Sequence, residues 1–189
     1  GDTINFTGGV VATAPSAVTV NGTVTAAGTG VITLGDSDTG VAVASSATIG
    51  GTSTGAITLG AATLVDGATL TVGTGIANTI SLSSVTGTAA GTTSHLTINT
   101  TGAATISGVV GTDIGTITIT NSGGTTFSST VDAATVAITS TSLNNAVTFN
   151  GNLNLTSGMT VGAGAAAYNV AINGSSNTIA GTTTFSNTG

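Results

Sequence analysis

The chain has 189 residues, of which only 3% are charged, and it contains no Lys, Arg, Cys or Trp. Its six acidic residues are all Asp, and its formal net charge at pH 7 is -6. An ordinary soluble domain has roughly a quarter charged residues, and a chain without cationic side chains cannot grip nucleic acid or an anionic membrane surface. The absence of Cys excludes disulfides and thiolate chemistry. The sequence has no run of about 18 apolar residues, so membrane insertion is not expected. A nucleic-acid partner is not expected either, because cationic side chains are missing.

Apolar and polar residues alternate along the chain, which is typical of strands that bury one face. The clearest case places Val147, Phe149, Gly151, Leu153 and Leu155 at every second position. Helical spacing does not extend over a useful length, and Gly and β-branched residues disfavour helix. In chain order, short strands are expected near residues 4–6, 18–25, 32–34, 41–43, 57–59, 70–72, 80–82, 96–98, 116–120, 147–155 and 170–172.

A degenerate repeat of about 20 residues accompanies this alternation. A motif of apolar, any, apolar, then Asn or Thr begins at residues 96, 117, 136, 153 and 170. Related sequences GVITLG at 30–35 and GAITLG at 55–60 lie 25 positions apart. Between the motifs, a second set of short strands is expected to end at Ile106, Phe127, Phe149, Val161 and Phe185.

This repeat matches one turn of a parallel β-helix, also called a β-solenoid, because stacked turns bury a core that one turn cannot bury alone. The chain is therefore predicted to be all-β, with about nine turns that form a rod on the order of 40 Å long. It is interpreted as one β-repeat domain over 1–189, less regular over 1–90 and more regular over 91–189. It lacks an initiator Met, so it is taken as mature protein or as an excerpt of a longer repeat protein. A β-sandwich is the alternative fold, but the recurrence and the single proline, Pro15, favour the solenoid.

The scarcity of charge has a physical reason in such a stack. Each outward side chain lies about 4.8 Å from its counterparts in neighbouring turns, where like charges repel by about 1 kcal/mol even in water. Thr, Ser and Asn can instead form hydrogen-bonded ladders. We therefore expect the outward positions of successive turns to carry these neutral polar residues.

The segments GTITITNSGGTTF at 115–127 and AVTFNGNLNL at 146–155 resemble the repeats of large bacterial surface proteins. That group includes filamentous-haemagglutinin-like adhesins, autotransporter passengers and Thr/Ala/Gly-rich S-layer proteins. The resemblance covers most of the chain and rests on composition and period. It implies export, an extracellular or cell-surface location, and a structural or adhesive role, and it carries over no functional residue. The chain lacks the repeated Gly-Gly-x-Gly-x-Asp nonapeptide of calcium-binding toxin-type repeats.

Residues that could support catalysis are few. His95 is the only imidazole, and it shares parity with Thr97 and Asn99, so it is expected to point outward as an inert surface residue. A catalytic triad needs a nucleophile, a base and an orienting acid in contact, and no acid lies near His95 in sequence. No catalytic residue is assigned, and an enzyme is not expected.

Asp36 and Asp38 form the one acidic pair in close sequence. Carboxylates two residues apart in a turn, with Ser, Thr and backbone oxygens nearby, are candidate ligands for Ca²⁺, which prefers oxygen. The competing interpretation is a solvated turn in which Asp binds local backbone N–H groups. The other four aspartates, at positions 2, 66, 113 and 132, are interpreted as turn residues, and no other cofactor is expected.

Two functions remain open. The first is a structural module of an extracellular or cell-surface fibre, adhesin stalk or surface layer, which self-associates through β-strand edges or continues into further repeats. Its main partner would be itself, with a glycan or host surface as a further candidate. The alternative is a Thr-array module that recognises ice or glycan. Thr-x-Thr pairs begin at Thr23, Thr69 and Thr116 at irregular intervals, and this alternative requires the threonines to align in successive turns.

Overall fold

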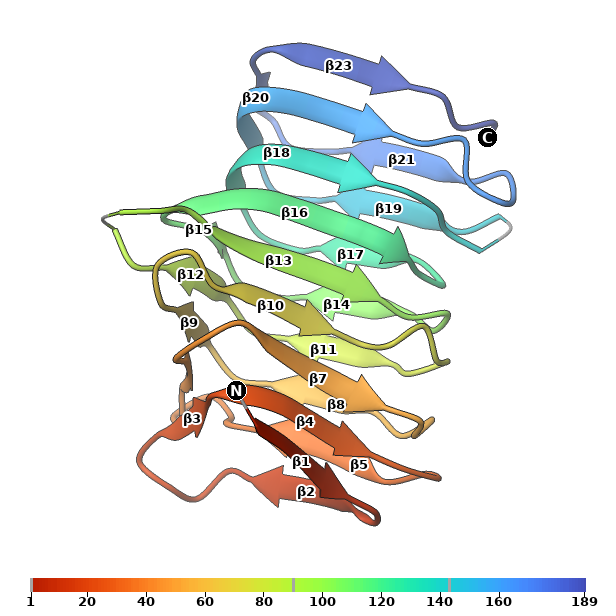
Figure 1. Ribbon diagram of the computed structural model, residues 1–189. Helices are drawn as coiled ribbons and strands as arrows, with labels where there is room; N and C mark the ends of the chain where they lie inside the picture. The colour runs from red at the N-terminus through yellow and green to blue at the C-terminus, as the bar shows by residue number, and fades with distance from the viewer. Residues whose placement is uncertain (1, 90, 143) are drawn as a thin grey trace.

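The computed structural model describes residues 2–89, 91–142 and 144–189 as a parallel β-solenoid (Figure 1). Within these residues, 23 strands joined by turns form eight complete turns and the first strand of a ninth. Every pair of neighbouring strands is parallel. The predicted all-β solenoid is therefore confirmed, with one turn fewer than the nine expected, and the β-sandwich alternative is wrong.

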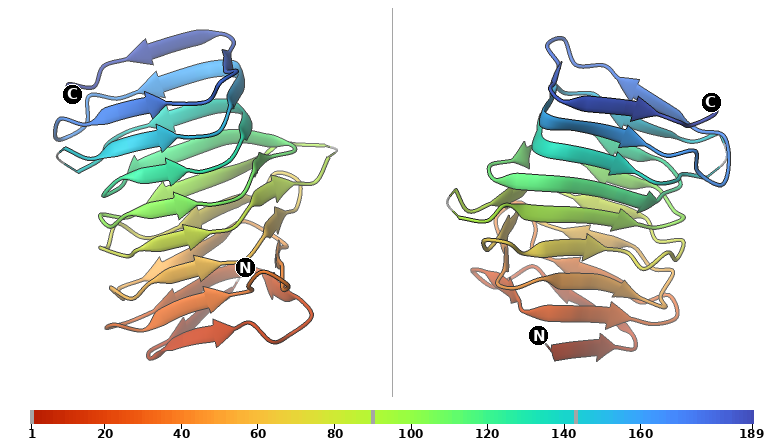
Figure 2. Two further views of the ribbon diagram at one scale, coloured as in Figure 1. Left: turned by 180° about the vertical axis from the view of Figure 1, so that it is seen from behind. Right: turned by 45° about the horizontal axis from the view of Figure 1, so that its top comes forward.

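The strands stack in three ladders that form the sides of the solenoid, and Figure 2 shows these ladders from two further directions. Face 1 consists of β1 (Asp2–Phe6), β4 (Gly22–Ala26), β7 (Ala47–Gly51), β10 (Thr69–Val72), β13 (Ser94–Asn99), β16 (Ile114–Asn121), the C-terminal parts of β18 (Val131–Ile138) and β20 (Leu153–Val161), and β23 (Thr182–Phe185). Face 2 consists of β2 (Gly9–Ala12), β5 (Val31–Leu34), β8 (Ile57–Leu59), β11 (Ile80–Leu82), β14 (Ala104–Ile106), β17 (Thr125–Phe127), β19 (Ala146–Phe149) and β21 (Asn169–Ile172). Face 3 consists of β3 (Val18–Val20), β6 (Val41–Val43), β9 (Ala62–Leu64), β12 (Val85–Gly87), β15 (Val110–Gly111), the N-terminal parts of β18 and β20, and β22 (Thr178–Ile179).

Two strands continue around a corner and serve two faces. In β18, Val131 pairs with β15 of face 3, whereas Thr135 pairs with β16 of face 1. In β20, the corner falls at Gly158, whose φ of 124° is a conformation that residues with a Cβ rarely adopt. A Cβ at Gly158 would also lie against the carbonyl oxygen of Thr182 in the next turn. Glycine is therefore required at this corner for both conformation and close approach.

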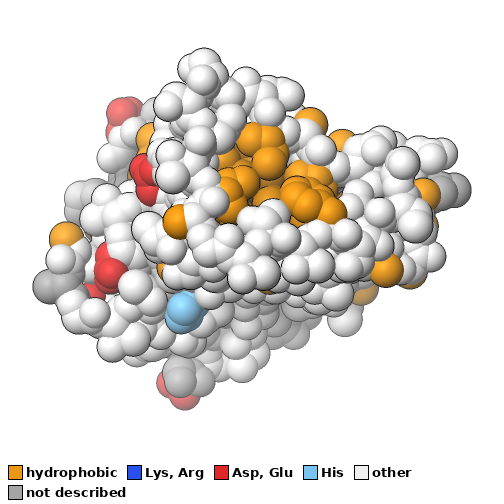
Figure 3. Space-filling model, turned by 90° about the horizontal axis from the view of Figure 1, so that it is seen from above, with side chains coloured by type: hydrophobic (Ala, Val, Ile, Leu, Met, Phe, Trp, Pro, Cys, Tyr) orange, Lys and Arg blue, Asp and Glu red, His pale blue; other side chains and the backbone are white. Residues whose placement is uncertain are grey.

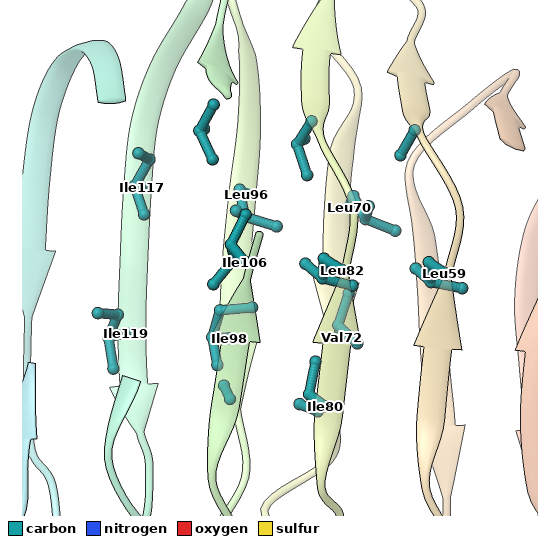
Figure 4. Close-up of a cluster of buried hydrophobic side chains, with 14 of the residues drawn as sticks. Leu59, Leu70, Val72, Ile80, Leu82, Leu96, Ile98, Ile106, Ile117 and Ile119 are labelled. Atoms are coloured by element: carbon teal, nitrogen blue, oxygen red, sulfur yellow. The ribbon is translucent and has the colours of Figure 1, made fainter. Parts of the chain in front are cut away.

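The core is a continuous column of inward side chains from all three faces. Figure 4 shows Leu96 and Ile98 of β13 beside Leu70 and Val72 of the preceding turn, in the register that pairs Leu70 with Leu96 and Val72 with Ile98. These four side chains are buried. Burying a side chain of this size contributes roughly 1.5–3 kcal/mol, so a slip that moved these side chains outward would lose that stabilisation at each position.

The aromatic residues reinforce the C-terminal half of this core. The rings of Phe127 and Phe149 belong to neighbouring strands of face 2 and stack with centroids 4.8 Å apart and planes 3° apart. Tyr168 is fully buried, and its hydroxyl donates a hydrogen bond to the carbonyl oxygen of Gly162. Burial raises the pKa of the Tyr168 phenol. The hydroxyl therefore stays protonated and ties the connection between β20 and β21 to the core.

The repeat read from the sequence is correct in part. Ile32 and Leu34 pair with Ile57 and Leu59, as their similar segments predicted. The motifs at 96, 117 and 136 also occupy equivalent places on face 1. The motif at 153, however, lies on face 3 opposite Val131, and the motif at 170 lies on face 2. The expected equivalence of these last two motifs with the others is therefore wrong, because every face buries alternate residues and the same motif arises on all three.

The second set of strand ends and the strand expected over 147–155 need similar corrections. Ile106, Phe127 and Phe149 do share face 2, whereas Val161 and Phe185 lie on face 1. Residues 147–155 are not one strand, because β19 ends at Phe149 and β20 begins at Leu153 on another face. Alternation continues through the corner between them, which explains why the sequence reads as a single strand.

Candidate functional site

The pair Asp36 and Asp38 lies in the connection between β5 and β6, with both side chains exposed. Asp36 Oδ1 accepts hydrogen bonds from the backbone N–H groups of Asp38, at 2.9 Å, and of Thr39, at 2.8 Å. Thr39 is buried and donates its hydroxyl to the carbonyl oxygen of Pro15 in the preceding turn. The predicted turn role of Asp36 is therefore confirmed, and the N–H groups of Asp38 and then Thr39 lower the pKa of Asp36.

This lowered pKa predicts how stability changes with pH. The Asp36 pKa is lower in the folded chain than in the unfolded chain, where it is about 3.9. The ionised Asp36 carboxylate therefore stabilises the folded chain fully above that value, and this stabilisation is lost as pH falls through the folded-state pKa. In Asp36→Asn the amide oxygen keeps the turn but does not titrate. We expect urea unfolding at pH 7 and pH 3 to show a smaller acid-induced loss of stability in Asp36→Asn than in the natural chain. An equal loss in both chains would assign the acid sensitivity to the other aspartates.

Calcium binding at Asp36 and Asp38 stays a prediction. One oxygen of Asp36 already accepts two N–H groups, which leaves its other oxygen and the Asp38 carboxylate to face a cation. If Ca²⁺ binds here, the melting temperature should rise on addition of Ca²⁺, and the double variant Asp36→Asn/Asp38→Asn should lose this response. The variant Asp66→Asn serves as a control at a separate turn. An unchanged melting temperature with Ca²⁺ and with chelator contradicts the prediction.

His95 points outward from β13, as its parity predicted. Its Nδ1 accepts a hydrogen bond of 3.0 Å from the backbone N–H of Thr116 in the next turn. A neutral imidazole that accepts at Nδ1 carries its proton on Nε2. His95 is therefore tied to the face 1 ladder, at a register shift between β13 and β16.

The other aspartates are only partly turn residues. Asp66 begins a turn, and Asp113 lies in a bend with a left-handed φ of 61°. Asp2 and Asp132, by contrast, lie within strands β1 and β18, so their interpretation as turn residues is wrong. Asp132 points outward and accepts a hydrogen bond of 2.7 Å from the side-chain amide of Asn154 in the next turn. Among the described residues, no group of three or more His, Cys, Asp or Glu side chains is arranged to hold a metal ion.

Two surface hollows lie beside three of the aspartates, Asp36, Asp113 and Asp132. A concavity of about 290 Å³ crosses the C-terminal ends of β8 and β11, and the Asp36 connection forms one side of it. A second, of about 380 Å³, lies at the corner of faces 3 and 1 and is lined by Asp113 and Asp132. Both hollows are lined mainly by Ser, Thr and apolar residues, and their described lining does not bring a nucleophile, a base and an acid together as catalysis requires.

Face 1 carries an outward column of threonines that runs the length of the solenoid. In the order of the strands, this Thr column consists of Thr3, Thr23, Thr48, Thr71, Thr97, Thr118, Ala137, Thr160 and Thr184. Its successive members lie at unequal intervals along the chain, the longest from Thr71 to Thr97 and the shortest from Thr118 to Ala137. The irregular intervals in the sequence therefore become a single aligned column in the structure.

A second outward column flanks the first from β10 onward. This flanking column consists of Thr69, His95, Thr116, Thr135, Gly158 and Thr182. We call the two columns together, from β10 to β23, the Thr face. The Thr-x-Thr pairs are visible in the sequence, but their alignment in successive turns is not. Thr between two apolar residues is the sequence pattern that marks an outward Thr. The same pattern occurs at Thr33 and Thr58 on face 2, so it does not distinguish face 1 from face 2.

Hydrogen-bonded ladders form between turns, but not along the Thr column. Asn173 donates to Asn150 at 3.0 Å, and the hydroxyls of Thr116 and Thr135 lie 3.0 Å apart. In the part of the chain that the structure describes, no hydroxyl of the Thr column hydrogen bonds to another protein group. The expected ladders are therefore confirmed at some positions and are wrong for this column, whose hydroxyls face solvent.

The two axial ends of the solenoid expose apolar side chains. Ile4 of β1 and Phe185 of β23 occupy inward positions, yet each is 54% exposed because it has a neighbouring strand on one side only. Figure 3 looks onto the end that carries β23 and shows hydrophobic side chains exposed at its centre within a polar rim. On face 2, Val170 and Ile172 of β21 are only partly buried at this end. Each end is thus an apolar surface bordered by strand edges.

Comparison of the chain with known protein families, curated proteins and solved structures finds no match. Over the described ranges there is also no helix that is long and apolar enough to cross a membrane. Three features of the chain itself bear on its function: the axial ends, the neutral outward columns and the acidic turn at Asp36 and Asp38.

Proposed function

We propose that the chain is a structural module of an extracellular or cell-surface assembly, such as a fibre, an adhesin stalk or a surface layer. In this assembly the axial ends are covered by further turns of a β-solenoid, which belong either to another copy of the chain or to tandem repeats. The observation that carries the proposal is the contrast between Val161, which is fully buried, and Phe185, which follows it in the same inward column and is 54% exposed.

Strand edges add a second reason for stacking at the ends. β23 pairs with β20 and β1 pairs with β4, and among the described residues neither strand has a partner on its other edge. Unpaired edges of this kind are templates for another strand. Within the solenoid, stacking places apolar side chains over apolar ones and neutral polar side chains over neutral polar ones. A further turn at either end would repeat the same contacts without bringing like charges together.

Sedimentation velocity over a concentration series, with negative-stain microscopy, tests this proposal. We expect concentration-dependent growth into filaments one rod wide. The double variant Ile4→Asp/Phe185→Asp places charge on both axial ends and should remain monomeric. Val11→Asp is the matched control, because Val11 is 64% exposed but points outward from face 2. Monomers at every concentration, or equal loss of filaments in the control, contradict end-to-end assembly.

A further inference from the structure

We propose that the Thr face binds an ordered layer of water and, through it, the surface of ice. This role goes beyond the structural one, because it uses the outer side of face 1 and leaves the axial ends free. The ligand class is crystalline water, which is neutral and periodic in two dimensions. The Thr face is itself neutral and periodic in two dimensions.

The threonines of the Thr face form a dense two-dimensional lattice. Neighbouring strands lie about 4.8 Å apart, and alternate residues along one strand lie about 6.6 Å apart. Over the six strands from β10 to β23, threonine fills nine of the twelve positions of the two columns. The three exceptions are His95, Ala137 and Gly158. Thr side chains therefore repeat in both directions across the ladder.

Within the described residues, the hydroxyls of the Thr column have no protein hydrogen-bond partner. A Thr hydroxyl has one donor and two acceptor positions, and those of the Thr column are exposed or half-buried and have no bond within the described chain. Elsewhere the chain uses threonine differently, since the buried Thr100 donates to the carbonyl oxygen of Asn78. Water held by such hydroxyls bonds almost as well as a protein partner. The methyl group beside each hydroxyl restricts the orientation of the same water layer.

The Thr face differs from the other two faces and from a sugar-binding surface. Face 2 has a single outward residue in each of β8, β11, β14 and β17, so only one outward column, from Thr33 to Thr148, is continuous on that face. The outward column of face 3 includes Gly111, Asp132 and Asn154. Within the described residues, the imidazole of His95 is the one aromatic ring at an outward position of the Thr face, which has no Phe, Tyr or Trp on which a sugar ring could stack. These differences favour ice over a glycan as the ligand.

The test is capture of the purified chain by slowly growing ice, together with thermal hysteresis. The natural chain should enter the ice and lower the freezing point below the melting point. Thr97→Tyr/Thr118→Tyr places two rings on neighbouring strands of the Thr face and should abolish both effects. Thr105→Tyr/Thr126→Tyr makes the same change on neighbouring strands of face 2 and should leave both effects intact. Ala137→Thr fills a gap in the Thr column and should increase hysteresis.

Circular dichroism and the melting temperature would show that each variant keeps its fold. The proposal is overturned if the folded natural chain is excluded from ice. It is also overturned if the two double variants lose ice capture equally, because the effect would then not belong to the Thr face. Retention on microcrystalline cellulose without ice capture would assign the face to a glycan instead. Whether the chain forms filaments does not affect these outcomes, because filament growth is measured separately with the variants at the axial ends.

Discussion

Replacement of Phe149 by Ala is expected to lower the free energy of unfolding by about 3–5 kcal/mol. Phe149 is fully buried and stacks on Phe127. The substitution removes the ring and leaves a cavity that neighbouring turns cannot close, because the register of each strand is held by the strands above and below. Urea unfolding followed by circular dichroism measures this loss.

Phe185→Ala is the matched control for Phe149→Ala. Phe185 is 54% exposed, so its loss should cost about 1 kcal/mol or less in dilute solution. If Phe149→Ala does not fold, Phe149→Leu conserves most of the volume and should cost less than about 1.5 kcal/mol. Equal losses in Phe149→Ala and Phe185→Ala would contradict the assignment of Phe149 to the centre of the core.

The triple variant Thr71→Glu/Thr97→Glu/Thr118→Glu is expected to be less stable than a chain with the same three charges kept apart. Thr71, Thr97 and Thr118 are successive members of the Thr column. Three adjacent carboxylates create two neighbouring pairs, and each pair repels by about 1 kcal/mol. Urea unfolding at low and at high NaCl measures the difference, which should shrink as salt screens the charges.

The control carries Glu at Thr23, Thr71 and Thr118, which lie on alternate turns of the same column. Its net charge and composition equal those of the adjacent variant, so the part of the difference that salt removes reports the spacing of the charges. The same midpoint of unfolding for both chains, at every salt concentration, would contradict the explanation of the low charge content by stacking. A confirmed difference would explain why an outward column of this solenoid carries Thr where most soluble proteins carry Lys or Glu.

The two proposals place different functions on different surfaces. The axial ends are apolar and bordered by strand edges, so they suit stacking of further turns. The Thr face is neutral, periodic and lies along the side of the rod, so stacking would lengthen it rather than cover it. Ile4→Asp/Phe185→Asp and Thr97→Tyr/Thr118→Tyr therefore test the two functions independently.

Alternation in the sequence was enough to predict which residues point inward. Leu96 and Ile98 are buried and His95 and Thr97 lie outside, as their parity required. The all-β class and the solenoid also followed, because repeated short strands with abundant glycine cannot bury their apolar side chains in any one turn. The turn at Asp36 was predictable too, since an aspartate can accept N–H groups from the residues that follow it.

Only the tertiary structure decided which face each strand occupies. A period of two distinguishes inside from outside, but it is the same on all three faces, so Leu153 and Val170 could not be separated from Val136 by pattern. The face of a strand depends on where the backbone bends at a corner, as at Gly158. It also depends on the number of residues in each solenoid turn, which differs along the chain. Pairing of the core side chains absorbs that variation. It thereby aligns threonines that are irregularly spaced along the chain.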